Sequence, residues 1–193
     1  SKSNVAVNLA LTLAESGKKV VLVDCDLRKP VLHRYLKAGH NVKGVSNVLS
    51  NQCTLDETLQ ELKEMNLTFL PAGTPPPNPS EMLSQPQMQA MVNTLREKFD
   101  VVIFDAPPVS VVTDAAVIGR CVDGAMFVVR SDYAPADAVR GAVKKLQDAG
   151  VRVLGSVLTR YDMKKALKGS SYAYSYAYNY NYAYEKQKAD VAE

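Results

Sequence analysis

The stretch VVLVDCDLRKP (residues 20–30) predicts a buried β-strand followed at once by a charged loop. Its first part is an unbroken apolar run rich in β-branched residues, which is typical of a strand buried on both faces of a parallel sheet. The loop carries Asp24, Asp26, Arg28 and Lys29. Because side chains alternate along an extended chain, both aspartates point to the same side and their carboxylates converge. Such a pair suits Mg²⁺ coordination, or one carboxylate could take a proton while the other holds the metal. The alternative is an ordinary polar turn.

The rest of the chain alternates strand patterns with helix patterns. Further short apolar runs predict strands at residues 67–71, 101–105, 125–129 and 151–158. Helical spacing of apolar residues predicts helices at residues 4–16, 55–65, 87–98, 114–120 and 136–149. Thr54 and Glu57 form a capping box in front of the second of these helices. The alternation predicts a doubly wound α/β domain with a mostly parallel sheet and helices on both faces.

The first residues of the chain have the pattern of the end of a P-loop. Ser1, Lys2 and Ser3 precede an apolar helix, and a P-loop ends in Gly-Lys-Ser/Thr where a helix begins. Lys2 would then meet the β- and γ-phosphates, and the Ser3 hydroxyl would bind Mg²⁺. Ser1 stands where glycine is expected, and the glycine-rich loop and its strand are not in the sequence. Either the chain is a fragment of a longer protein, or nucleotide binding is compromised.

A second apolar strand also ends on an acid. FDVVIFDAPPV (residues 99–109) places Asp105 directly after the strand, followed by two prolines that stop regular structure. An acid in this position is typical of a Walker B motif, whose carboxylate holds Mg²⁺ directly or through water.

Seven tyrosines occupy every second position of YAYSYAYNYNYAY, residues 172–184. They are Tyr172, Tyr174, Tyr176, Tyr178, Tyr180, Tyr182 and Tyr184. A segment so near the C-terminus is usually mobile, which favours a cluster of phosphate acceptors. The same alternation is also that of a β-strand, so an aggregation-prone edge strand is the alternative.

Composition sets modest limits. With 23 basic and 20 acidic residues the net charge of +3 is too small to indicate nucleic-acid binding. The three cysteines have no metal-binding spacing, which favours a reducing cytoplasm. No stretch is long and apolar enough to span a bilayer and no signal peptide is visible, so the chain as given is expected to be soluble.

Together these motifs resemble those of the bacterial tyrosine kinases that control capsule and exopolysaccharide export, which have a MinD/ParA-like P-loop fold. VDCDLRKP is similar to the family's Walker A′ motif and FDAPPV to its Walker B motif. Residues 72–88 contain the family's Pro-Asn-Pro-Ser-Glu segment, and residues 111–135 match its Thr-Asp-Ala, Val-Asp-Gly and Val-Val-Arg stretch. The tyrosine cluster corresponds to its C-terminal autophosphorylation site.

The resemblance implies ATP as substrate, Mg²⁺ as cofactor and a role for each site residue. Lys2 would neutralise charge on the transferred group, while Mg²⁺ would be positioned by Ser3, Asp26 and Asp105. Asp24 would accept the proton of the tyrosine phenol. Nucleotide binding would involve Lys2, Ser3, Asn4, Arg28, Thr159 and Arg160. Arg28 would either touch phosphate or lock the loop by pairing with a neighbouring acid. Thr159 and Arg160 replace an asparagine that commonly lies near the adenine.

The resemblance also implies an organisation and a set of partners. Residues 1–168 would form the kinase domain and residues 169–193 a flexible tail. The tail of one subunit would enter the site of the next in a homo-oligomeric ring. The kinase would work at the cytoplasmic face of the membrane with a transmembrane chain-length-determinant region, upstream in the same chain or on a separate activator. A protein-tyrosine phosphatase would reset the tail. Two other functions stay open: a partition-type ATPase of the same fold, and a non-catalytic phosphoacceptor scaffold.

Overall fold

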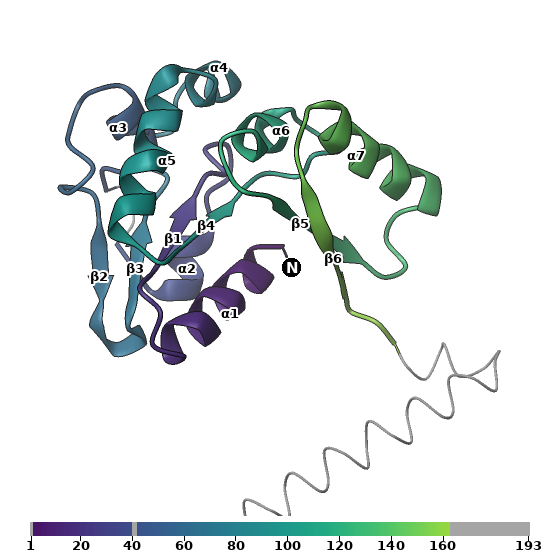
Figure 1. The fold of residues 1–193 in the computed structure, drawn as a ribbon, viewed down its shortest axis with the longest axis horizontal. Coiled ribbons are helices and arrows are strands. Elements are labelled where there is room, and N and C mark those ends of the chain that lie inside the picture. Colours follow the sequence, from purple (N-terminus) through teal and green to yellow (C-terminus); the bar gives the residue numbers. More distant parts are fainter. Residues whose placement is uncertain (1, 40–41, 163–193) are drawn as a thin grey trace, which may run out of the picture.

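The structure is a computed structural model that describes residues 2–39 and 42–162 of the 193-residue chain (Figure 1). Its helices are α1 (Lys2–Glu15), α2 (Leu32–Leu36), α3 (Val45–Leu49), α4 (Pro79–Leu83), α5 (Pro86–Lys98), α6 (Asp114–Gly119) and α7 (Ala136–Asp148), with a 3₁₀ turn η1 (Lys63–Met65). Its strands are β1 (Val20–Asp24), β2 (Gln60–Leu62), β3 (Leu67–Leu70), β4 (Val101–Asp105), β5 (Ala125–Arg130) and β6 (Val153–Thr159).

The larger sheet has the strand order β2-β3-β1-β4. Strand β1 is central and pairs in parallel with β3 on one side and with β4 on the other. Strand β2 runs antiparallel to β3 at the edge. Every residue of β1 is buried, which explains why the strand is apolar without alternation up to its final aspartate.

Helices cover both faces of this sheet. Val20 and Leu22 point to the face on which α1 and α2 pack, where α1 contributes Val7, Ala10 and Ala14. Val21 and Val23 point to the opposite face, which is covered by α3, α5 and α6. The small side chains of α1 recur at helical spacing, so the helix can lie close against the sheet. The layered arrangement confirms the predicted α/β class (Figure 1).

Strands β5 and β6 pair in parallel as a separate two-stranded sheet. Helix α7 packs against β6 and buries Ala142 and Leu146. The residues of β4 before Asp105 are half-buried although they are apolar, in contrast to β1. Within the described ranges, no strand pairing joins β4 to β5.

The predicted helix over residues 55–65 is wrong. Its capping box does form: the Thr54 amide donates to Glu57 Oε2 (2.7 Å) and the Glu57 amide to Thr54 Oγ1 (3.4 Å). The chain then turns into β2 and η1 instead of continuing as a helix. Leu55 and Leu62 belong to hydrophobic clusters on opposite faces of the sheet, so one helical face could not bury both. Pairing with β3 therefore overrides a local helix signal.

The other predicted strands and helices agree with the structure to within two residues at each end. Strand β2 and the short helices α2, α3 and α4 were not expected from the sequence pattern. Each of these helices has five residues, which is too short to show a helical period.

Candidate active site

The carboxyl ends of β1 and β4 bring two acidic side chains together. Asp24 ends β1, Asp105 ends β4, and the two residues are partners in register across the sheet. One residue further on, the Cys25 amide donates to the Asp105 carbonyl oxygen (2.9 Å). Only 1% of each aspartate is exposed. The two acids therefore lie buried at the edge where open α/β sheets bind their ligands.

The first turn of α1 adds a cation and a hydroxyl at this edge. Lys2 forms an ion pair with Asp105 Oδ1, and Lys2 Nζ lies 3.4 Å from Ser3 Oγ. Ser3 is buried, whereas 33% of the Lys2 side chain is exposed. Helix α1 packs on both β1 and β4, which fixes its start beside the strand ends. The unpaired N–H groups and the dipole of a helix start attract anions, phosphate in particular.

The second carboxylate oxygen of Asp105 is the feature that fits a metal ion. Asp105 Oδ2 is buried and accepts no hydrogen bond from the part of the chain that is described. A buried carboxylate oxygen without a donor is costly, and a bound cation would satisfy it. Asp105, Ser3 and Asp26 would offer oxygen ligands, the kind that Mg²⁺ prefers. Among the described residues no group of three or more His, Cys, Asp or Glu could hold a metal alone. The remaining ligands of Mg²⁺ here would be water or phosphate oxygens.

The buried Asp24 carboxylate binds two backbone amides, one in the charged loop that follows β1 and one at the start of α2. Its Oδ1 accepts the Asp26 amide (3.2 Å) and its Oδ2 accepts the Leu32 amide (3.2 Å). Burial raises the pKa of Asp24 to about 7, against the lowering effect of these two hydrogen bonds, and the neighbouring Asp105 raises it further. Asp24 therefore changes its charge near neutral pH.

Asp26 is the more accessible acid of the loop. It is half-buried, and its Oδ1 accepts the Lys29 amide (3.0 Å). Its charge is one of the causes of the raised pKa of Asp24. That both carboxylates converge on one metal ion stays a prediction. The loop thus presents one carboxylate toward solvent and keeps the other inside.

Arg28 pairs with an acid from a distant part of the chain. Its Nε donates to Asp114 Oδ2 (2.9 Å) and its Nη2 to Asp114 Oδ1 (3.3 Å) and to Ser80 Oγ (2.9 Å). Arg28 therefore pairs with an acid in this structure, and its contact with phosphate stays a prediction. Sequence reasoning missed Asp114 and Ser80 as members of this group. The signal lay in the Thr-Asp-Ala and Pro-Asn-Pro-Ser-Glu segments that contain them.

Comparison with known proteins decides the family. A sequence-family model described as an AAA domain matches residues 1–122. The tyrosine-protein kinase YwqD of Bacillus subtilis (strain 168) is 35% identical over 171 residues, which cover 89% of this chain and 70% of that protein. The tyrosine-protein kinase CpsD of Streptococcus agalactiae serotype III (strain NEM316) is 32% identical over 168 residues, covering 87% and 72%. This chain belongs to the bacterial tyrosine kinases.

Solved structures agree with this assignment. The BceF tyrosine kinase domain is 40% identical with a TM-score of 0.74, covering 81% of this chain and 62% of that chain. The kinase domain of the Escherichia coli tyrosine kinase ETK is 32% identical with a TM-score of 0.76, covering 82% and 63%. The septum site-determining protein MinD of Pyrococcus horikoshii is 23% identical with a TM-score of 0.69, covering 83% of this chain and 65% of that chain. At this identity the similarity shows only that the fold is shared. The family and the MinD-like fold predicted from the sequence are therefore confirmed, and the chain is a protein-tyrosine kinase with a nucleotide-binding P-loop fold.

Three further residues are predicted to contact the nucleotide: Asn4, Thr159 and Arg160. Asn4 is exposed on α1 and accepts a hydrogen bond from Asn8 Nδ2 (3.0 Å). Thr159 ends β6, and its hydroxyl donates to a main-chain carbonyl of β5 (3.2 Å). Arg160 follows as an exposed residue with a φ of 55°. Their roles in nucleotide binding stay predictions.

The predicted phosphate acceptors lie outside the described residues. This holds for all seven tyrosines of residues 172–184, and for the predicted boundary at residue 168. Among the helices that the structure describes, none has the length and apolar character needed to cross a bilayer.

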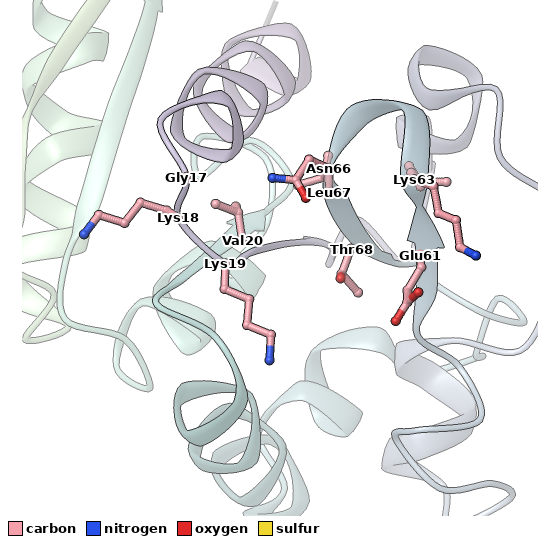
Figure 2. Close-up of a pocket in the computed structure, with 10 residues that line it drawn as sticks. Gly17, Lys18, Lys19, Val20, Glu61, Lys63, Asn66, Leu67 and Thr68 are labelled. Carbon is pink, nitrogen blue, oxygen red and sulfur yellow. The ribbon is translucent and has the colours of Figure 1, made fainter.

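A pocket of about 350 Å³ lies at the opposite end of the strands from Asp24 and Asp105 (Figure 2). It is lined by residues 17–20, 61–63 and 66–68, where β1 and β3 begin. Figure 2 shows Lys18, Lys19 and Lys63 pointing in different directions around it. The strands run away from this pocket toward Asp24 and Asp105, so the pocket is separate from the acidic site.

Proposed function

We propose that this kinase transfers the γ-phosphoryl group of ATP to tyrosines of its own C-terminal cluster, from one copy to another. The observation that carries the proposal is the ion pair of Lys2 with the buried Asp105, where the start of α1 meets the ends of β1 and β4. A lysine and free helix amides at this place suit the phosphates of a nucleotide. Phosphoryl transfer depends mostly on positioning and charge stabilisation, which such a group supplies.

Mg²⁺ would be held by Asp105 Oδ2, the Ser3 hydroxyl and Asp26, together with phosphate oxygens. Support comes from the buried Oδ2 that lacks a donor within the described chain and from the buried Ser3 beside it. When bound, the ion would neutralise phosphate charge and orient the transferred group. Lys2 forms an ion pair with Asp105 in this structure. Once a bound metal ion neutralises that carboxylate, Lys2 would be free to bind phosphate.

The proton of the attacking phenol needs an acceptor, because free tyrosine has a pKa of ~10 and is a weak nucleophile while protonated. Asp24 remains the first hypothesis, supported by a pKa of about 7. Against it stand its burial and the two amides that occupy its oxygens. Asp26, which is only half-buried, is the alternative on the same loop. Single Asp24→Asn and Asp26→Asn variants distinguish the two when Mg²⁺-dependent nucleotide binding is measured beside kinase activity, because Asp26 is also a proposed metal ligand: the proton acceptor is the residue whose loss abolishes transfer and leaves that binding intact.

The acceptor would be the cluster of seven tyrosines, which has no charged residue and a tyrosine at every second position of residues 172–184. Each phosphotyrosine adds about −1.5 to −2 charges, so complete phosphorylation would add on the order of −10 to −14. Such a tail would repel other tails and leave acidic sites, which favours disassembly of the proposed ring. By family resemblance, the process would regulate capsule or exopolysaccharide export at the cytoplasmic face of the membrane. Its partners would be a transmembrane chain-length-determinant region and a phosphatase.

Phosphate mapping on the intact native protein tests the proposal. The protein is incubated with Mg²⁺ and ATP beside an Asp24→Asn, Asp26→Asn double variant, and phosphotyrosine is located by mass spectrometry. Phosphate within residues 172–184 of the wild type alone is the expected result. Hydrolysis of ATP without phosphotyrosine would favour the partition-type ATPase, and neither activity would favour the scaffold.

Transfer between copies needs a mixing experiment. The double variant with its tyrosines intact supplies the acceptor, and a protein with all seven cluster tyrosines changed to phenylalanine supplies the kinase. Phosphate on the double variant in the mixture supports transfer between copies. Its absence, while the wild type alone is modified, would show that each chain modifies only itself.

A further inference from the structure

Asp114 is a buried charge that the proposed chemistry does not use. It lies in the first turn of α6 and is 0% exposed. It accepts two hydrogen bonds from Arg28, and a third from Ser80 Oγ reaches its Oδ1. Burial would raise the pKa of Asp114, but the hydrogen bonds from Arg28 and Ser80 outweigh it and lower the pKa. A carboxylate that stays ionised inside a protein needs partners held in fixed positions.

Arg28 connects this buried charge to the acidic loop. It stands two residues after Asp26, with 39% of its side chain exposed. The guanidinium binds Asp114 through two nitrogens, a geometry that fixes the direction of the side chain. Its Nη2 also donates to Ser80 Oγ, which closes a ring of hydrogen bonds among the three residues.

The three members of this ring come from three separate segments. Arg28 belongs to the loop after β1, Ser80 to α4 and Asp114 to α6. Helices α4 and α6 also contact each other directly, so two packed elements hold the far side of the ring. Inside the loop, Asp24 and Asp26 organise the backbone through the Leu32 and Lys29 amides. Arg28 thus connects this loop to α4 and α6 by hydrogen bonds, beside Cys25 and Leu27, which share a hydrophobic cluster with Leu83 of α4 and Ile118 of α6.

We propose that Asp114 and Ser80 are positioning residues that hold the Asp26 loop through Arg28 and so set the geometry for Mg²⁺ at the active site. This inference rests on the proposed function, because it takes Asp26 as a metal ligand. The three residues act on the metal indirectly, like the outer-shell partners that orient metal-binding side chains elsewhere.

Nucleotide binding at varied Mg²⁺ concentration tests the inference without relying on kinase activity. The intact protein is titrated with the fluorescent nucleotide mant-ADP, and the Mg²⁺ concentration for half-maximal binding is measured. Asp114→Asn is expected to raise this concentration roughly tenfold, the lower end of what loss of an outer-shell partner costs. Arg28→Ala is expected to do the same, and the Arg28→Ala, Asp114→Asn double variant to do no more than Arg28→Ala.

Two further variants make the test specific. Ser80→Ala keeps the ion pair of Arg28 with Asp114 and is expected to fold normally, with a smaller increase in the required Mg²⁺. Asp123→Asn breaks the exposed ion pair with Arg96 (3.2 Å) and is the matched control, expected to change nothing. If Asp114→Asn does not fold, the inference is judged by the Mg²⁺ concentration that Ser80→Ala requires for half-maximal binding.

The outcomes separate the inference from the proposed function. The inference alone is overturned if the wild type shows Mg²⁺-dependent binding and the Mg²⁺ concentration for half-maximal binding is unchanged in Ser80→Ala and Asp114→Asn. Additive shifts in the double variant would also overturn it, because Asp114 would then act by a route other than Arg28. A wild type without Mg²⁺-dependent nucleotide binding would overturn the proposed function, and the inference with it.

Discussion

Asp24 and Asp105 end adjacent parallel strands as register partners, yet the fold stabilises the two charges by different means. Asp105 has a cation, Lys2, supplied by α1. Asp24 has two backbone amides supplied by its own loop, and its pKa rises to about 7. Two buried carboxylates of one strand edge are therefore expected to respond differently to pH and to substitution.

Asp24→Asn is expected to flatten the pH dependence of folding stability. Folding raises the pKa of Asp24 from 3.8 to about 7. Between these values the folded chain holds a proton that the unfolded chain has released. The stabilisation from this group is complete below the unfolded pKa and is lost as the pH rises through the folded pKa. The full loss is at most roughly 4 kcal/mol. Urea unfolding across this pH window measures the effect.

The quantity that decides this prediction is the stability of the wild type minus that of the Asn variant. It should fall as the pH rises from the acidic to the neutral end of the window. Glu97→Gln, which removes an exposed negative charge, shows how much of the slope is a general effect of charge. Parallel curves for the wild type and Asp24→Asn would contradict the raised pKa.

Asp105→Asn and Lys2→Met are expected to change the stability of the nucleotide-free protein in opposite directions. Asp105→Asn removes a buried charge and leaves Lys2, which is partly exposed, free to reach water. We therefore expect its free energy of unfolding to rise by about 1 kcal/mol. Lys2→Met leaves that charge buried without its cation and should cost roughly 2–3 kcal/mol, less than for a fully buried pair. Thermal unfolding without nucleotide measures both.

The same two variants should both lose Mg²⁺-dependent binding of mant-ADP. Stability and binding would then change independently at Asp105, as expected for a functional site that costs stability. A loss of stability in Asp105→Asn as large as that in Lys2→Met would contradict this account of the pair.

Cys25 is expected to resist alkylation in the folded protein. Burial raises the pKa of its thiol well above 9, and the neighbouring Asp24 and Asp105 raise it further. Cys53 and Cys121 are half-buried, and burial also raises the pKa of Cys121. The thiolate is the reactive form, so iodoacetamide should label Cys53 first, then Cys121, and Cys25 only after unfolding. Mass spectrometry of a labelling time course measures the order, and early labelling of Cys25 would show that its loop opens.

Two glycines should respond to alanine with opposite signs. A Cβ on Gly44 would lie 2.0 Å from the Pro71 carbonyl oxygen and 2.5 Å from the Gly73 nitrogen, where backbone must move. Gly44→Ala should therefore cost roughly 3 kcal/mol or more. Gly141 is exposed within α7 with nothing within 4 Å, and Gly141→Ala should add roughly 0.5–1 kcal/mol.

Urea unfolding of both glycine variants measures the difference. Gly141→Ala serves as the control for a general effect of adding a methyl group. An unchanged stability of Gly44→Ala would mean that the turn before α3 can shift away from β3 without loss.

The strand ends of the site could be predicted because their signal is local. An apolar run that ends in Asp24 or Asp105 identifies a buried strand and the acid at its carboxyl edge, whatever the rest of the chain does. Lys2 and Ser3 were identified in the same way, from a short pattern at the start of a helix. In each case the residue type and its immediate neighbours contain the information.

The helix at residues 55–65 could not be judged from such local signals. Thr54 and Glu57 form the predicted hydrogen bonds, and the chain still makes only a turn before β2. The decision comes from β3, which offers Leu62 a backbone partner and a place on the other face of the sheet. Competition between local and tertiary contacts is absent from the sequence pattern.

The sequence by itself determined the alternation of buried strands and helices, the acids at the strand ends and the tyrosine-rich end, because composition and periodicity are properties of neighbouring residues. The tertiary structure decided which distant side chains meet. Arg28 and Asp114 are 86 positions apart, and only the packing of α6 brings them within 2.9 Å. Burial, which sets the pKa of Asp24 and leaves Asp105 Oδ2 without a donor among the described residues, likewise exists only once the strands and helices have assembled.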